Sequence, residues 1–296
     1  MFLSLGEVML RFCPGDLPLR AASSFTFSEG GGEYNVARAL SRCFEVPAGI
    51  ATSLVENDIG QLVHQLIRSS GVNTDQVLWR DFDGTGDSVR NALYFAERGS
   101  GYRSPSAVMD RANSPASQIQ PAHFDWDSLF ASGAISWFHT GGIFAGLSDS
   151  CAATALQAMQ SARQHGVQVS YDPNFRASLW QNKGGSMAAA ERNRQLARHA
   201  DTLFGIAPLL SHSPPPKNQA EFDQCLKETA QHFPQLSSIA VGQRHIVSAS
   251  CHHYQATVYH EGTIEHLDGY QNIPVVDRIG SGDAVAAGYI PARIDN

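Results

Sequence analysis

Apolar positions along the chain alternate between two spacings, one typical of buried strands and one typical of amphipathic helices. The stretch PAGIATSL (47–54) indicates a strand, and a helical pattern that ends at Gly71 follows it. The apolar positions of this helix are Ile59, Leu62, Val63, Leu66 and Ile67. AISWFHT (134–140) and VQVSYD (167–172) predict two more strands, with a second helical pattern between them. This alternation predicts right-handed βαβ units and a parallel sheet, which is an α/β fold.

One segment breaks this alternation. Residues 88–111 indicate two strands joined by a glycine-rich turn at 99–101. Leu93 and Phe95 would fall on one face of the first strand, and Tyr94 on the other. Such a ribbon lies flat on the main sheet or projects as a flap, and the pattern favours neither.

Length and charge narrow the classes of function. With 296 residues and 43% hydrophobic residues, the chain can bury a large core as one domain. The net charge of −7 and the lack of a basic run argue against nucleic-acid binding. Glu7 and Arg11 interrupt the apolar N-terminus, and no apolar run approaches the roughly 20 residues that span a bilayer. We therefore expect neither a secretory signal nor a membrane segment.

The cysteines and histidines give no sign of a metal site. The five cysteines are scattered and form no CxxC pair, which predicts reduced thiols and a cytoplasmic protein. His252 and His253 are adjacent, so in a strand they would point to opposite faces and could not easily share an ion. We expect no metal ligands among the side chains.

The stretch DRIGSGDAVAAG (277–288) places a glycine turn between a short predicted strand, Ile273–Val276, and a helix that begins near Asp283. The backbone N–H groups of such a turn and of the helix N-terminus form a cradle for an anion. Asp283 has two interpretations. It caps the helix, or it is a base that takes a proton from an attacking hydroxyl beside a bound phosphate.

Two further polar stretches are candidates for a ligand site. SEGGGEYNVARAL (28–40) has neither the spacing of a dinucleotide fingerprint nor the lysine of a P-loop. Its glycines let a polar ligand approach the backbone, or they form a hinge. In SYDPNFRASLW (170–180), Asp172, Asn174 and Arg176 would face one way beyond the carboxyl end of a strand, where open α/β sheets bind ligands. A capped surface turn would have the same sequence.

Together these stretches resemble the ribokinase-like (PfkB) family of sugar kinases. GGGEYNVA is similar to the family's N-terminal glycine–asparagine signature, and VENDIGQLVHQLIRSSGV and DRIGSGDAVAAG are similar to its later signatures. LYF, DPNFRASLW and VVDRIGSGD are most similar to 2-keto-3-deoxygluconate kinases. The resemblance runs from about residue 3 to residue 290. It implies a single kinase domain over 1–296, a Rossmann-type three-layer sandwich with a small β-sheet lid formed by strands around 10–28 and 88–111.

The resemblance also implies a reaction: ATP-dependent phosphorylation of a sugar acid such as 2-keto-3-deoxygluconate to its 6-phosphate, with Mg²⁺ bridging ATP. Asp283 would be the general base, and the amides of Gly280, Ser281 and Gly282 would stabilise the transferring phosphoryl group. Arg244 would contact the nucleotide. The positions implied for the sugar are Gly31, Gly32, Asn35, Tyr94, Arg111 and Arg176. Two arginines suit a carboxylate through bidentate hydrogen bonds, which favours a sugar acid over a neutral sugar.

The sequence departs from the family pattern at three places. Met109 stands where relatives usually have a tyrosine, and a thioether cannot donate a hydrogen bond. Ile206 and Ala207 replace polar residues that organise the metal–phosphate region, so direct Mg²⁺ binding by this segment is not implied. The chain ends soon after Asp283, and Pro291 forbids a long helix there. We therefore expect the family's last helices, which close the adenine pocket, to be missing after residue 290.

Two alternatives stay open beside a sugar-acid kinase. One is a catalytically impaired relative that only binds a sugar acid, and the other is a kinase of the fructokinase or ribokinase type. The exposed strand edges of a lid predict pairing with a second copy, that is, a homodimer.

Overall fold

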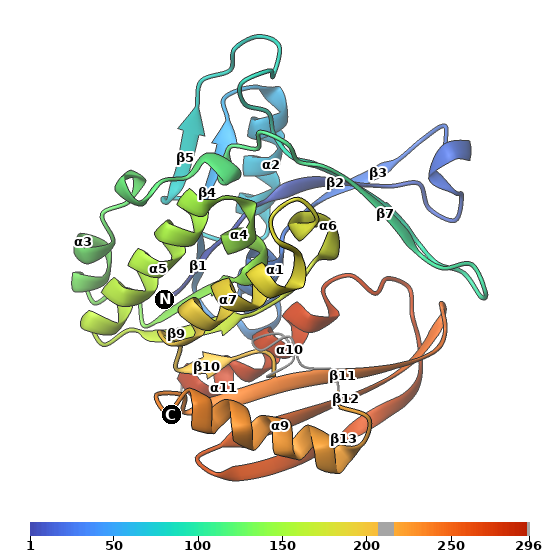
Figure 1. Cartoon of the computed structure of the whole chain (residues 1–296). Coiled ribbons are helices and arrows are strands. Elements are labelled where there is room, and N and C mark those ends of the chain that lie inside the picture. Colours follow the sequence, from blue (N-terminus) through green and yellow to red (C-terminus); the bar gives the residue numbers. More distant parts are fainter. Residues whose placement is uncertain (207–215, 295–296) are drawn as a thin grey trace.

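The computed structural model describes residues 1–206 and 216–294, and within them nine strands form one sheet (Figure 1). The strands are β1 (Phe2–Leu5), β4 (Ala48–Val55), β5 (Val77–Arg80), β8 (Trp137–Gly141), β9 (Gln168–Asp172), β10 (Thr202–Leu203), β11 (Ser238–Ser248), β12 (Cys251–His260) and β13 (Thr263–Pro274). Their spatial order is β13-β12-β11-β10-β9-β8-β1-β4-β5. From β5 to β11 neighbours run parallel, whereas β12 and β13 are antiparallel additions at one edge.

Helices cover both faces of this sheet. One face carries α1 (Gly32–Phe44), α2 (Asp58–Ser69) and α10 (Ser281–Tyr289). The other carries α3 (Trp126–Ala131), α4 (Gly142–Leu147), α5 (Asp149–Gln164), α7 (Gly185–Ala197) and α9 (Gln219–His232). Shorter helices are η1 (Leu19–Ala21), η2 (Ala116–Gln118), η3 (Pro121–His123), α6 (Ala177–Trp180) and α11 (Pro291–Ile294).

The central strands are apolar because they are covered on two sides. Every residue of β4 and of β8 is buried, as expected for parallel strands inside a layered α/β protein. One apolar cluster fills the space beneath α1, α2 and α10, and a second fills the space beneath α3, α5, α7 and α9. The protein is thus a three-layer sandwich, which confirms the predicted α/β fold.

A second, four-stranded sheet projects to one side of the body (Figure 1). We call it the small sheet; its strands are β3 (Thr26–Gly30), β2 (Met9–Cys13), β6 (Leu93–Glu97) and β7 (Ser106–Asp110), in that spatial order. One row of directly paired residues shares a face, and we call it the inner row: Ser28, Arg11, Tyr94 and Met109. The neighbouring row, on the opposite face, is the outer row: Phe27, Phe12, Phe95 and Val108.

The helices and parallel strands predicted from the apolar spacing are present as α2, α5, β4, β8 and β9. The edge of the sheet differs from the prediction. The strand predicted as Ile273–Val276 is the end of the much longer β13, which stops at Pro274. β12 and β13 are joined by Glu261 and Gly262, both with positive φ (46° and 89°), a turn that suits a tight antiparallel hairpin. In the described part of the chain no helix has the length and apolarity that a membrane crossing requires.

Candidate active site at the carboxyl ends of the strands

Asp283 lies in the first turn of α10. The N-cap of this helix is Gly280, whose φ of 84° is in the left-handed region that favours glycine. The interpretation of Asp283 as the capping residue is therefore wrong, because Asp283 is the third residue inside the helix. Its Oδ2 accepts a hydrogen bond from Nδ2 of Asn35 at 2.7 Å. Burial raises the pKa of Asp283, while the Asn35 hydrogen bond and the charge of Arg176 oppose that rise.

The glycines before α1 bring that helix close to Asp283. A Cβ on Gly32 would lie 3.9 Å from Oδ1 of Asp283, and a Cβ on Gly280 would lie 3.7 Å from Nδ2 of Asn35. Gly31 has a different reason to be glycine, since a side chain there would overlap the carbonyl oxygen of Glu7. Its φ of 176° is ordinary extended backbone. The predicted stretches 28–40 and 277–288 therefore meet.

The segment after β9 adds a chain of polar contacts. Asn174 donates to Oδ2 of Asp172 at 3.5 Å, and Arg176 donates to Oδ1 of Asn174. These three side chains are joined, as their alternation in the sequence predicts. Burial raises the pKa of Asp172 to about 8, and the charges of Asp283 and Glu33 act in the same direction. Asp172 therefore holds its proton more tightly than an exposed aspartate does.

Glu33 is a buried carboxyl that the sequence analysis missed. Its carboxylate lies between two glycines: a Cβ on Gly6 or Gly141 would come within 2.5 Å or 2.9 Å of its oxygens. It accepts a hydrogen bond from the backbone of Phe144, in the first turn of α4. Burial raises the pKa of Glu33 to about 7, and the charge of Asp283 adds to the rise. A glutamate inside a glycine-rich helix start was the available signal.

Glu33, Asp172 and Asn174 lie in the wall of an open pocket of about 200 Å³, and Asp283 is not among its lining residues. Its lining residues are Gly32, Glu33, His139, Gly141, Ile143, Asp172 and Asn174. His139 is neutral there, because burial lowers its pKa to about 3. Its Nδ1 lies 2.9 Å from Oγ of Ser170, which accepts from Nε1 of Trp137 at 2.8 Å. Ser170 thus joins His139 to Trp137.

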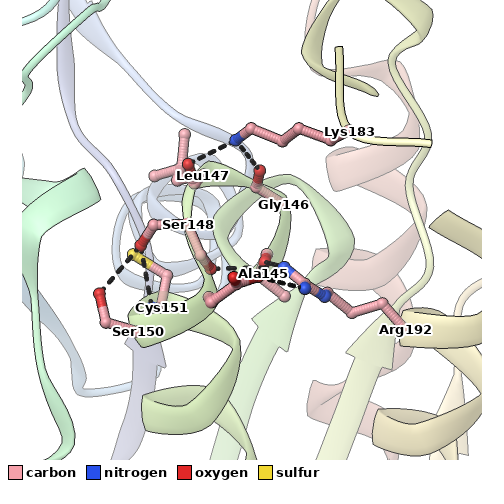
Figure 2. A network of polar contacts seen from close by, with 9 residues as sticks. Ala145, Gly146, Leu147, Ser148, Ser150, Cys151, Lys183 and Arg192 are labelled. Carbon is pink, nitrogen blue, oxygen red and sulfur yellow. Dashed lines mark hydrogen bonds and ion pairs between the residues drawn. The ribbon is translucent and has the colours of Figure 1, made fainter. Parts of the chain in front are cut away.

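Helix α4 forms one wall of this pocket and is held at its far end by two cations (Figure 2). Nζ of Lys183 donates to the carbonyl oxygens of Gly146 and Leu147 at 2.9 and 2.7 Å. Arg192 donates to the carbonyl oxygens of Ala145 and Ser148 at 3.2 and 3.4 Å. Positive charge at a helix C-terminus is favourable. With Glu33 at its start, this short helix is fixed at both ends by side chains of other elements.

The small sheet carries the remaining predicted sugar positions. Tyr94 is buried in the row that also holds Arg11 and Met109. Arg111 follows β7, and its guanidinium pairs at 2.5 Å with the buried carboxylate of Glu7. That pairing leaves Arg111 less free for a ligand carboxylate than the sequence suggests.

The remaining predicted positions are Arg244, Ile206 and Ala207. Arg244 lies on β11 in register with Tyr254, on the face of the sheet where Gly242 packs against Val285 of α10. Ile206 is buried in the apolar cluster beneath α5 and α7. Ala207 lies outside the described residues.

The start of α10 fits a phosphate group. The N-terminal backbone N–H groups of a helix lack partners within the helix, and Ser281 and Gly282 occupy its first two positions. A Cβ on Gly282 would meet no atom within 4 Å, so the first turn of α10 is open on this side. In the described part of the chain, His, Cys, Asp and Glu form no group of three that could hold a metal ion. Mg²⁺ usually keeps several waters and binds through one or two carboxylates together with nucleotide phosphates, so an ion here would be held mainly by the phosphates.

A family model described as "pfkB family carbohydrate kinase" matches residues 3–296. The chain belongs to the pfkB family of carbohydrate kinases. This confirms the resemblance seen in the signatures at 28–40 and 277–288.

Relatives within the pfkB family include several sugar kinases. A 2-dehydro-3-deoxygluconokinase of Bacillus subtilis is 27% identical over 99% of this chain and 83% of its own length. A 2-dehydro-3-deoxygalactonokinase of Haloferax volcanii is 29% identical over 60% of this chain, and a fructokinase-2 of Solanum habrochaites is 31% identical over 61%. In these last two matches the chain spans about half of the relative's length, 53% and 52%.

Solved structures with the names of sugar kinases share the fold. A 2-dehydro-3-deoxygluconokinase from Thermotoga maritima superimposes with a TM-score of 0.89 and 27% identity, covering 99% of this chain and 87% of the other. A putative ribokinase II from E. coli, in complex with ATP and Mg²⁺, has a TM-score of 0.75 at 16% identity, covering 100% and 86%. At 16% identity, the likeness to the E. coli structure shows a shared fold only.

Proposed function

We propose that this pfkB protein transfers the γ-phosphoryl group of ATP to the terminal hydroxyl of a sugar acid of the 2-keto-3-deoxygluconate type, giving the 6-phosphate. The observation that carries the proposal is the position of Asp283. Its half-buried carboxylate accepts a hydrogen bond from Asn35 and lies in the first turn of a helix whose N-terminal backbone N–H groups have no partners within the helix.

In this proposal Asp283 takes the proton of the sugar hydroxyl. The hydroxyl oxygen then forms a bond to the γ-phosphorus while the bond between that phosphorus and the bridging oxygen of ADP breaks. Backbone N–H groups of Gly280, Ser281 and Gly282 stabilise the charge on the transferring group. Mg²⁺, bound to the phosphates, would neutralise part of their charge.

Asn35 has two uses in this reaction. Its hydrogen bond favours the ionised form of Asp283, which the base needs, and it fixes the direction of the carboxylate. Gly32 leaves room beside Oδ1 for an incoming hydroxyl. We therefore assign the sugar site to the space between Gly31–Asn35 and the inner row of the small sheet, with that sheet as a lid.

The cations around Tyr94 support a sugar acid as the substrate. The charges of Arg11, Arg278 and Arg176 all lower the pKa of the Tyr94 hydroxyl, against the larger effect of burial, so all three lie near it. Because Arg11 is already paired with Asp277, Arg176 and Arg278 are the guanidinium groups that remain for a substrate carboxylate. The name of the Bacillus subtilis relative, which matches 99% of this chain, agrees with this class.

A neutral hexose is the second candidate. The observation in its favour is the pairing of Arg111 with Glu7, which removes one of the two arginines that the sequence suggests for a carboxylate. The Solanum habrochaites fructokinase is similar over part of the chain.

An ADP-release assay on a substrate panel tests the proposal. The panel contains 2-keto-3-deoxygluconate, 2-keto-3-deoxygalactonate, fructose and ribose, each with Mg–ATP. We expect the highest kcat/KM for one of the two keto-acids. A preference for fructose or ribose would support the neutral-sugar kinase instead. Calorimetric binding of a keto-acid without turnover would support a protein that only binds it.

We also propose that the protein is a homodimer joined through the outer row of the small sheet. Phe27 and Val108 in this row are about half exposed, and Phe12 stacks on Phe95 between them. Light scattering after gel filtration tests this. Phe27→Lys should shift the mass to that of a monomer, while Met187→Lys, at an exposed position on α7, should not. A monomeric wild type would contradict the dimer.

The five cysteines are all free thiols. Free thiols, together with a reaction that uses ATP, support our inference of a cytoplasmic location.

A further inference from the structure

Arg11 contacts the segment that leads into the glycine turn. It lies in the middle of the small sheet's inner row, with its guanidinium 5.9 Å from the centre of the Tyr94 ring. The same guanidinium forms an ion pair with Oδ2 of Asp277. The side chains of Arg11 and Asp277 are only 15% and 27% exposed. A residue of the small sheet is thus bound to the loop that precedes α10.

The other oxygen of Asp277 shapes the turn itself. Oδ1 accepts a hydrogen bond from the backbone N–H of Ile279 at 3.0 Å. This is the local turn that aspartate side chains form with the backbone two residues further on. Gly280, with its left-handed φ, comes next and begins α10. One carboxylate therefore connects Arg11 to the backbone that places Ser281, Gly282 and Asp283.

Little else in the described structure holds this segment. Val276 is 73% exposed and Ile279 is 37% exposed, so neither side chain is anchored in a core. At the start of the segment, the N–H of Val275 donates to the carbonyl oxygen of Ser250 at 2.9 Å. The ion pair and the Ile279 hydrogen bond are therefore the main polar contacts that orient residues 276–279.

A second contact ties the small sheet to the same region. In the turn between β6 and β7, the carbonyl oxygen of Gly101 accepts from the N–H of Ala249 at 3.0 Å. The N–H of Gly101 donates to Oγ of Ser250 at 3.0 Å. A pocket of about 390 Å³ lies between this contact and the ion pair, with Arg11, Tyr94 and Asp277 in its wall. The position of the small sheet is thus linked at two points to the chain before α10.

We propose that Arg11 and Asp277 are a positioning pair that gives the glycine turn its catalytic shape when the small sheet covers the sugar site. This inference rests on the proposed function. Neither residue is assigned to the reacting atoms; both act through the backbone of Ile279 and Gly280. When the ion pair is formed, it holds the N–H groups of the turn and the carboxylate of Asp283 in the right position relative to the bound sugar.

Four variants test the pair. Arg11→Gln removes one charge. Asp277→Asn removes the other but keeps an oxygen that can accept from Ile279. The double variant and the charge reversal Arg11→Asp with Asp277→Arg complete the set. The control is Arg90→Gln. Arg90, which precedes β6, forms an ion pair with Asp110 of β7, and the two side chains are 45% and 50% exposed. Exposed ion pairs contribute little to stability.

We expect each single variant to lower kcat by roughly ten- to a hundredfold, because small misplacements of reacting groups have effects of that size. The double variant should be no worse than either single one, since coupled residues are not additive. The charge reversal should not recover the loss, because Asp277→Arg leaves no side-chain acceptor for the N–H of Ile279. Additive losses in the double variant, or full recovery in the charge reversal, would overturn the proposal. A raised KM for the sugar in Arg11→Gln alone, with Asp277→Asn unaffected, would assign Arg11 to the substrate instead.

Hydrogen exchange in the ligand-free protein tests the same coupling without any turnover. The amides of Ile279 to Asp283 should exchange faster in Arg11→Gln and Asp277→Asn than in the wild type and in Arg90→Gln. Unchanged exchange would overturn the inference. A wild type that transfers no phosphoryl group but shows the coupled exchange would refute the proposed function and leave the pair standing.

Discussion

At the scale of single residues, the three carboxyls of the site, of Glu33, Asp172 and Asp283, differ in how firmly they hold a proton. Burial raises the pKa of all three, to about 7 for Glu33 and about 8 for Asp172. Each accepts a hydrogen bond that favours its ionised form, from Asn35 for Asp283, from Asn174 for Asp172 and from the backbone of Phe144 for Glu33. The charge of Asp283 also pushes the other two towards their neutral forms. Asp283 is therefore the carboxyl best placed to act as the base near neutral pH.

Met109→Tyr tests the inner row of the small sheet. Met109 is paired with Tyr94 in the ladder and is 40% exposed, so a phenol there can donate a hydrogen bond towards the sugar site. We expect the KM for the sugar acid to fall by roughly two- to tenfold, because a hydrogen bond contributes about 0.5–1.5 kcal/mol. Met187→Tyr, at an exposed position of α7, is the matched control. An unchanged KM in Met109→Tyr would remove this position from the sugar site.

The sequence could show some of these residues and not others. Asp172, Asn174 and Arg176 were predictable because alternation after a strand places side chains on one side. The burial of Glu33 was not, because it depends on room left by Gly6 and Gly141, which are distant in the sequence. Asp283 could be interpreted as the N-cap of α10 because aspartate is common at N-cap positions. The structure shows that Gly280, with its left-handed φ, is the N-cap instead.

At the scale of elements, α4 depends on its neighbours. It has six residues, too few for a stable helix in isolation. Glu33 binds its first turn, and Lys183 and Arg192 bind its last carbonyls. The wall of the pocket at Gly141 to Ile143 is thereby fixed by α1, α7 and the loop before α7. The helices α2 and α5 were predictable from apolar spacing, but α4 has no such pattern.

Arg192→Met tests this anchoring. The variant loses two hydrogen bonds to carbonyl oxygens and an ion pair with Asp149. We expect the free energy of unfolding to fall by about 1–3 kcal/mol, the usual effect of leaving buried acceptors without a partner. Arg194→Met, which breaks only an exposed pair with Glu191 on the same helix, should change it by less than about 0.5 kcal/mol. Equal effects in a urea titration would contradict the anchoring role.

At the scale of the whole molecule, the layered fold brings distant segments to one edge of the sheet. The start of α1, the end of β9 and the start of α10 meet at the carboxyl ends of the strands, where parallel sheets bind ligands. The layer order was predictable from alternating periodicity. The antiparallel β11–β13 edge was not, because the pairing of long, partly exposed strands is decided by turns such as that at Glu261 and Gly262.

The buried carboxyls also predict how the stability of the whole protein varies with pH. Glu33 and Asp172 have raised pKa values in the folded protein, about 7 and about 8, against ordinary values of 4.5 and 3.8. Between these values the folded state binds more protons than the unfolded state. The stability that they contribute is therefore complete below pH 4 and is lost as the pH rises to about 8.

Melting curves measured at several pH values check this prediction. We expect Tm to fall between pH 5 and about 8 as the stabilising contribution of Glu33 and Asp172 is lost. In Glu33→Gln this fall should be shallower. Glu191→Gln is the control, since the pKa of that exposed residue is lowered by Arg194. An identical slope in the wild type and Glu33→Gln would contradict the assignment of a raised pKa to Glu33.

The most direct measurement of the central claim is the turnover of Asp283→Asn. The amide oxygen can still accept from Asn35, so the site keeps its shape, but the variant cannot take the proton of the sugar hydroxyl. We expect kcat to fall by about 10²–10⁴-fold, with sugar binding retained in calorimetry. Turnover equal to that of the wild type would contradict the assignment of Asp283 as the base.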